Sequence, residues 1–100
     1  MPRNPELMRH NIAEMAKALE GADASLIERF FYSLLTPSEA DEMAKRWALV
    51  KELAEGTPQR RIAEDLGLSL CKITRGSREL KKEGAAFRIL LERLKEKGSA

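Results

Sequence analysis

Two short helical segments on either side of Gly67 restrict the possible folds of this chain more than any other part of it. The segments are expected over residues 58–66 and 70–82. Two helices can meet at a steep angle across a short turn if the turn tolerates a positive φ, as Gly67 does, and the first helix carries a small residue, here Ala63. The apolar side chains expected to fill the angle are Leu66, Leu70 and Ile73. The spacing therefore predicts a helix-turn-helix over residues 58–82.

The clearest helix start lies at Thr36. The sequence Thr-Pro-Ser-Glu from this residue has the pattern of a capping box. The Thr36 hydroxyl can accept the backbone N–H of Glu39, and the Glu39 carboxylate can accept the N–H of Thr36. Proline suits the first helical position because its missing N–H has no partner there. Thr57 and Ser69 are expected to cap the two short helices in a similar way.

The remaining apolar residues recur at helical spacing, and no stretch alternates as a strand does. The other helices are expected over Glu6–Leu19, from after Asp23 to Leu34, over Pro37–Glu55 and over Ala85–Lys97. Together with the two short helices they predict an all-α chain of six helices. We expect one domain over residues 6–97, between a flexible N-terminus (1–5) and a flexible tail (98–100).

The composition argues against several classes of protein. No apolar run approaches the roughly 18 residues of a membrane span, and the first ten residues lack the apolar stretch of a signal peptide. The single cysteine, Cys71, and the single histidine, His10, allow no internal disulfide and no cluster of His and Cys ligands. No nucleophile–base pair or glycine-rich phosphate loop indicates an enzyme. We therefore expect a non-enzymatic protein of the reducing cytoplasm, without metal or cofactor.

Positive charge is concentrated in residues 57–82, which carry a net charge of +4, whereas the rest of the chain carries −2. At about 100° per residue, one side of the second short helix is apolar or small: Leu70, Ile73, Ser77 and Leu80. The opposite, mostly cationic side comprises Cys71, Lys72, Arg75, Arg78, Glu79 and Lys82. Such a face suits the major groove of DNA, so nucleic acid is the expected partner.

Several short motifs of the chain match one known family. They are Leu34-Leu35-Thr36-Pro37, Arg46, Leu53 with Glu55-Gly56, Gln59-Arg60, Leu66-Gly67, Ile73-Thr74-Arg75-Gly76-Ser77 and Leu80-Lys81. In these motifs the chain resembles the bacterial tryptophan repressor family over about residues 25–95. The resemblance implies an intertwined, all-helical homodimer that binds a palindromic operator when L-tryptophan is bound. It also implies repression of genes for tryptophan biosynthesis or transport.

The resemblance further implies a ligand site. It places the indole of tryptophan between the guanidinium groups of Arg46 and Arg75, and a guanidinium plane stacks well on an aromatic face. Arg75 can also hold a carboxylate, and the ligand's ammonium group would lie at the C-terminal end of the second helix. The other implied ligand residues are Ser33, Leu35, Thr36, Val50, Gly76 and Glu79. From the residues alone, Arg46 could instead pair with Glu42 one turn earlier, and Arg75 could contact only phosphate.

On DNA, the resemblance implies phosphate contacts from Gln59, Thr74 and Arg75 and a base contact from Arg60. It places Leu70, Cys71 and Lys72 at the floor of the groove. Two further basic residues of the second short helix complete the predicted DNA-binding set, Arg78 and Lys81.

Three features depart from the family pattern. Glu79 stands where the family has a serine that helps to hold the ligand's amino group, and Lys72 stands where it has a small hydroxyl residue. The turn around Thr57 is one residue shorter. A carboxylate at position 79 could attract the ammonium group or repel the ligand's carboxylate, so a regulator with another corepressor, or none, is an alternative. A helical module whose basic face binds an acidic protein is the other, and the salt dependence of duplex binding separates it from a DNA-binding protein.

Overall fold

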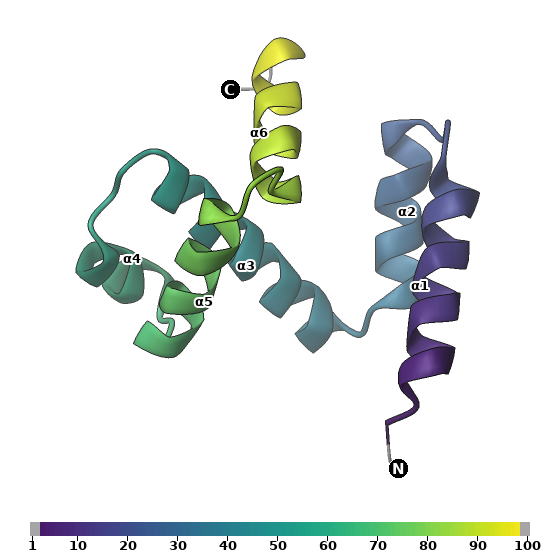
Figure 1. Cartoon of the computed structure of the whole chain (residues 1–100), viewed down its shortest axis with the longest axis horizontal. Coiled ribbons are helices and arrows are strands. Elements are labelled where there is room, and N and C mark those ends of the chain that lie inside the picture. Colours follow the sequence, from purple (N-terminus) through teal and green to yellow (C-terminus); the bar gives the residue numbers. More distant parts are fainter. Residues whose placement is uncertain (1–2, 99–100) are drawn as a thin grey trace. The chain divides into compact units, whose positions relative to one another are not determined.

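A computed structural model of the protein describes residues 3–98. The described residues form six helices and no strand (Figure 1): α1 (Pro5–Leu19), α2 (Ala24–Leu34), α3 (Pro37–Ala54), α4 (Gln59–Leu66), α5 (Leu70–Lys81) and α6 (Ala86–Glu96). The predicted all-α chain of six helices is confirmed, and every helix end lies within one residue of its expected position. The described chain divides into two compact units, the first ending at Ala40 and the second beginning at Asp41. The single domain over residues 6–97 stays a prediction.

The structure describes only part of the two terminal segments that were expected to be flexible. α1 includes Pro5, which was expected to be loose, because proline fits the first turn of a helix. The Asn4 side chain caps this helix by accepting the backbone N–H of Leu7 at 3.1 Å. At the other end, Gly98 follows α6. Residues 1–2 and 99–100 lie outside the described part of the chain.

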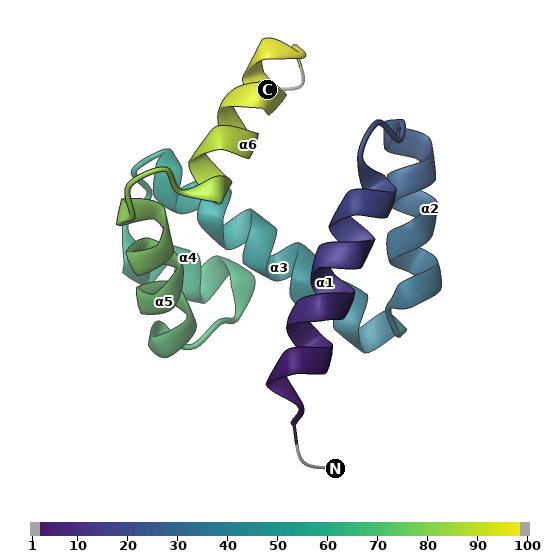
Figure 2. The same ribbon diagram turned by 45° about the vertical axis from the view of Figure 1, so that its right-hand side comes forward.

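The first unit contains α1, α2 and the beginning of α3. In both Figures 1 and 2, α1 and α2 lie side by side and antiparallel. Asp23 caps α2 by accepting the N–H of Leu26 at 2.9 Å. No described residue of either helix is buried. The exposed large apolar side chains on the two helices are Leu7, Met8, Ile12, Leu26, Phe31, Tyr32 and Leu34.

The capping box at the start of α3 has both predicted hydrogen bonds. The Thr36 N–H donates to Glu39 Oε1 at 2.9 Å, and the Glu39 N–H donates to the Thr36 hydroxyl at 3.2 Å. Both donors would otherwise lack partners at the helix start. α3 therefore begins at Pro37, as the sequence predicts.

The second unit has an apolar core built from three helices. Leu49 of α3, Ile62 of α4 and Ile73 of α5 are buried against one another. The partly buried side chains around them are Leu53, Ala63, Leu66 and Leu68. Gly67 ends α4 with φ +63°, in the left-handed region that glycine adopts without strain. The roles predicted for Ala63 and Gly67 agree with this arrangement.

The sequence placed Leu70 in the angle between α4 and α5, and this prediction is wrong. Its surface is 62% exposed, and Leu68 from the turn packs against the core instead. Leu70 is the first residue of α5 and is not among the residues packed against the core. The turn, in contrast, directs Leu68 back onto the buried residues.

The cap predicted at Thr57 is also wrong. α4 begins at Gln59 after Pro58, and no side chain caps its first turn. Proline occupies the capping position and has no side-chain oxygen to accept a backbone N–H. The Thr57 hydroxyl donates instead to Glu52 Oε2 at 2.7 Å. Ser69 does cap α5, where its hydroxyl accepts the N–H of Lys72 at 3.4 Å.

Candidate functional site

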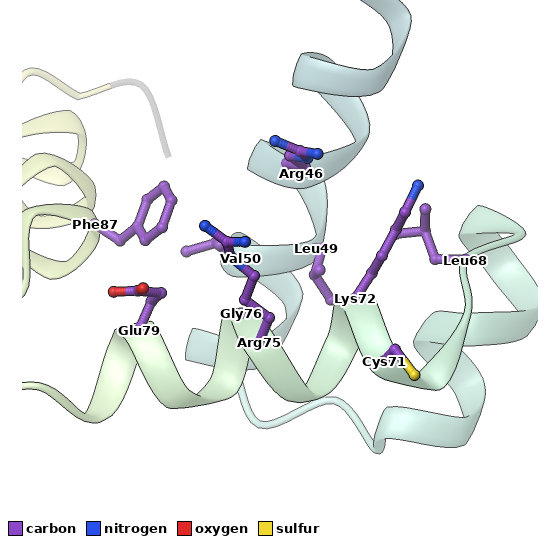
Figure 3. A pocket seen from close by; sticks show the side chains of 10 residues that line it. All are labelled: Arg46, Leu49, Val50, Leu68, Cys71, Lys72, Arg75, Gly76, Glu79 and Phe87. Carbon is purple, nitrogen blue, oxygen red and sulfur yellow. The ribbon is translucent and has the colours of Figure 1, made fainter. Parts of the chain in front are cut away.

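A pocket of about 470 Å³ lies in the second unit, between α3, α5 and the beginning of α6 (Figure 3). Its volume falls in the range typical of small-molecule sites. The lining residues are Arg46, Leu49 and Val50 of α3, Leu68 of the turn, Cys71, Lys72, Arg75, Gly76 and Glu79 of α5, and Phe87 of α6. Five of these belong to the predicted ligand set: Arg46, Val50, Arg75, Gly76 and Glu79.

The base of the pocket is apolar and closely packed. Leu49 and Val50 are each only 2% exposed. A Cβ atom on Gly76 would lie 3.2 Å from Leu49 Cδ2 and 3.3 Å from Leu53 Cδ1. Such distances are tighter than ordinary contacts, so glycine at this position lets α5 approach α3 closely. The resemblance assigned Gly76 to ligand binding, and the structure adds this packing role.

The two arginines predicted to enclose the ligand both line the pocket, one from each wall. Arg46 belongs to α3 and Arg75 to α5, and Figure 3 shows both guanidinium groups on the same side of α5. Arg46 also donates to Glu42 Oε1 at 3.2 Å, so the helical pair expected from their spacing forms as well. Among the described residues, no carboxylate oxygen lies within 4.0 Å of the Arg75 guanidinium. The pocket thus holds one guanidinium with an acidic partner and one without.

A second cation reaches the same oxygen of Glu42. Lys72 Nζ on α5 lies 3.1 Å from Glu42 Oε1 on α3. This hydrogen bond, the charge of Lys72 and then that of Arg46 hold the pKa of Glu42 below its usual value. Figure 3 shows the Lys72 side chain extending from α5 on the side of α3. Lys72 is therefore part of the pocket wall, although the sequence placed it only on the DNA side.

Glu79 brings a negative charge to the other end of the pocket. Its Oε2 atom lies 2.9 Å from Lys82 Nζ. The hydrogen bond from Lys82 is the main reason that the pKa of Glu79 lies below its usual value, and the charges of Lys82, Arg75 and Arg78 add to it. In Figure 3 the carboxylate lies beside Phe87. The pocket therefore offers a carboxylate acceptor as well as guanidinium donors.

The sequence missed several residues of the pocket. Nothing in the sequence assigned Leu49, Leu68 or Phe87 to a ligand site. Phe87 also packs against Trp47, with ring centroids 6.4 Å apart. Cys71, assigned to the groove floor, likewise lines the pocket. None of these positions belongs to the motifs that indicated the ligand site, and only the packing of α3, α5 and α6 brings them together.

The remaining three predicted ligand residues belong to the first unit. Ser33 is exposed near the end of α2, and Leu35 ends that helix by donating its N–H to the carbonyl of Phe31 at 3.0 Å. The Thr36 hydroxyl is engaged in the capping box. Their contacts with a ligand stay a prediction.

Every residue predicted to bind DNA is exposed. The set comprises Gln59 and Arg60 of α4 with Leu70, Cys71, Lys72, Thr74, Arg75, Arg78 and Lys81 of α5. The Thr74 hydroxyl donates to the carbonyl of Leu70 at 2.8 Å, which orients it along the helix. Five of the nine side chains are cationic, so α5 carries an accessible basic surface on the helix that also forms one wall of the pocket.

Two features are absent from the described residues. None of their helices is both long and apolar enough to cross a membrane. No group of three or more His, Cys, Asp or Glu side chains among them is placed to hold a metal ion.

Comparison with known proteins points to one family. The family model described as Trp repressor protein matches residues 10–95. A Trp operon repressor homolog of Chlamydia caviae is 42% identical over 69 residues, which cover 68% of each chain. A Trp operon repressor homolog of Vibrio parahaemolyticus is 36% identical over 77 residues, covering 72% of this chain and 75% of that protein. One from Vibrio vulnificus is 40% identical over 70 residues, covering 65% and 69%. No solved structure gives a significant match.

Proposed function

Because the chain belongs to the Trp repressor family of DNA-binding transcription repressors, which are not enzymes, we propose that L-tryptophan is its corepressor. In this proposal the protein is a cytoplasmic homodimer that represses genes of tryptophan biosynthesis or transport. Each chain uses α4 and α5 as a helix-turn-helix. The observation that carries the proposal is that α5 contributes both to the pocket and to the exposed basic surface.

The pocket has the chemistry that an aromatic amino acid requires. An indole ring can lie on the apolar base formed by Leu49 and Val50, with guanidinium planes of Arg46 and Arg75 on its faces. Arg75 has no carboxylate partner among the described residues and can hold the ligand's carboxylate. Glu79 can accept the ammonium group.

The coupling between ligand and DNA follows from their shared helix. Arg75 lines the pocket and belongs to the exposed set on α5, so a ligand that fixes Arg75 also fixes part of the DNA-binding surface. If the ligand favours the conformation that binds DNA, DNA must favour ligand binding by the same factor. In a homodimer, two copies of α5 would occupy major grooves about 34–36 Å apart on a palindromic operator.

Calorimetric titration with L-tryptophan tests the ligand, since Trp47 would confound a fluorescence titration. We expect saturable binding of one ligand per chain. The titration is repeated at several temperatures, because a binding enthalpy can pass through zero at one of them. Selection of duplexes from a random-sequence pool, with and without L-tryptophan, then tests the DNA. A palindromic consensus recovered only with the ligand supports the proposal, whereas no heat and identical selections overturn the corepressor.

A second candidate function is a DNA-binding regulator that does not respond to tryptophan. Glu79 favours it, because this side chain lines the pocket and its negative charge can repel a ligand carboxylate. Equal operator affinity with and without L-tryptophan would favour this candidate. Absence of affinity for any duplex at low salt would instead favour a protein-interaction module.

A further inference from the structure

Glu42 occupies an unusual position among the charged residues around the pocket. One of its carboxylate oxygens, Oε1, accepts from Arg46 at 3.2 Å and from Lys72 at 3.1 Å. Arg46 belongs to the same helix, but Lys72 lies 30 residues further along the chain. Of the ion pairs in the described chain, only the one between Glu42 and Lys72 joins two different helices.

We propose that Glu42 is a positioning residue that competes with DNA for Lys72 and so lowers the affinity of the protein for DNA. This inference rests on the proposed function. The positive charge of Lys72 is partly balanced while its Nζ atom lies 3.1 Å from the Glu42 carboxylate, so less of this charge is available to DNA. About half of each side chain is exposed, so their contact can exchange for another partner without a large desolvation cost.

Arg46 connects this competition to the pocket. Arg46 and Lys72 share one acceptor oxygen and both line the cavity. A ligand that draws the Arg46 guanidinium toward itself removes a competing cation from Glu42 and therefore strengthens the hold of Glu42 on Lys72. Glu42 thus acts on duplex binding through Lys72 and on ligand binding through Arg46, without lining the pocket itself.

The test compares Glu42→Gln with Asp41→Asn. Each substitution removes one negative charge from neighbouring positions of α3, but Asp41 pairs with Lys45, which does not line the pocket. Duplex affinity is measured against salt concentration, with and without L-tryptophan, on a mixed-sequence duplex and on the selected operator. Circular dichroism checks that both variants keep the helical content of the wild type.

We expect Glu42→Gln to bind the mixed duplex roughly threefold to tenfold more tightly than Asp41→Asn at low salt without ligand. Its affinity should also fall more steeply with salt. The slope of log affinity against log salt concentration should be steeper by about one for each Lys72 that contacts DNA. The factor by which L-tryptophan strengthens duplex binding should grow, because the ligand can no longer strengthen the hold of Glu42 on Lys72. A change that reflects only overall charge would appear equally in both variants.

A second test uses the Lys72→Met variant. It should weaken duplex binding, and adding Glu42→Gln to it should then change duplex affinity no more than Asp41→Asn does, since the residue through which Glu42 acts is gone. An equal effect of Glu42→Gln with and without Lys72 overturns the inference, as does a Glu42→Gln protein that behaves like Asp41→Asn. The proposed function stands or falls separately, on whether the wild type binds duplex and L-tryptophan.

Discussion

The two units of this chain have nearly the same kind of secondary structure but very different interiors. Six apolar residues are buried in the second unit, whereas α1 and α2 of the first unit bury none. Ordering a residue costs about 1–2 kcal/mol of conformational entropy, which burial of apolar surface must offset. The second unit has its own core for this purpose. The first unit instead exposes large apolar side chains, which the proposed homodimer would cover.

The largest expected effect concerns the core of the second unit. Ile73 is fully buried, so Ile73→Ala removes well-packed apolar contacts and leaves a cavity. We expect a loss of roughly 2–5 kcal/mol in the free energy of unfolding, measured by urea denaturation. A loss below about 1 kcal/mol would contradict the core described for this unit.

A matched substitution in the first unit tests whether α1 and α2 are stable in an isolated chain or only in the proposed homodimer. Ile12 is 55% exposed, so Ile12→Ala should change the stability of an isolated chain by no more than about 0.5 kcal/mol. In the proposed homodimer it should cost about 1–3 kcal/mol, and the cost should depend on protein concentration. Urea unfolding at several concentrations, with sedimentation analysis of both proteins, measures the difference. A stability that is independent of concentration would argue against the dimer.

Removing a helix cap should have a smaller effect on stability, and one cap in each unit can be compared. Thr36→Ala removes one of the two hydrogen bonds of the capping box and should cost about 1 kcal/mol. Ser69→Ala removes a single bond of 3.4 Å and should cost about 0.5 kcal/mol. Thermal unfolding of the two variants under the same conditions gives the order. A larger loss for Ser69→Ala would reverse the comparison and show that the start of α5 depends more strongly on its cap.

The smallest expected effect is a pH dependence that arises in the second unit. Folding lowers the pKa values of Glu42 and Glu79, each mainly through a lysine. Carboxylates with lowered pKa values stabilise the fold above their unfolded pKa, and this contribution disappears as the pH falls through the folded pKa. Stability should therefore decrease slightly on acidification below about pH 4.5. Urea titrations across this range should show a shallower decrease in Glu42→Gln, and an unchanged profile would contradict the assigned cause.

The helices and most of their ends could be predicted from the sequence because the responsible signals are local. The apolar period of each helix, the Thr36–Glu39 capping box and the positive φ of Gly67 involve residues no more than a few positions apart. Thr57 was assigned wrongly because Pro58 separates it from the helix that it was expected to cap. Leu70 was placed inside because periodicity gives the face of a residue but not where the core ends.

Part of the pocket could also be predicted, but by a different route. Arg46, Arg75 and Gly76 came from the resemblance, while Val50 and Glu79 were included with them as members of the same implied site. The lining residues Leu49, Leu68 and Phe87 belong to none of the motifs that indicated the ligand site. They were missed because an apolar side chain at a core position and one at a pocket wall have the same pattern in a sequence.

The sequence alone determined the six helices, the basic character of α5 and the likeness to a repressor family, because each depends on residue type and short-range spacing. Only the tertiary structure decided that Lys72 turns toward Glu42 and that Gly76 brings α5 against α3. Both follow from contacts between residues far apart in the chain. The distance between such residues depends on how the helices pack around Leu49, Ile62 and Ile73, and local spacing does not specify this packing.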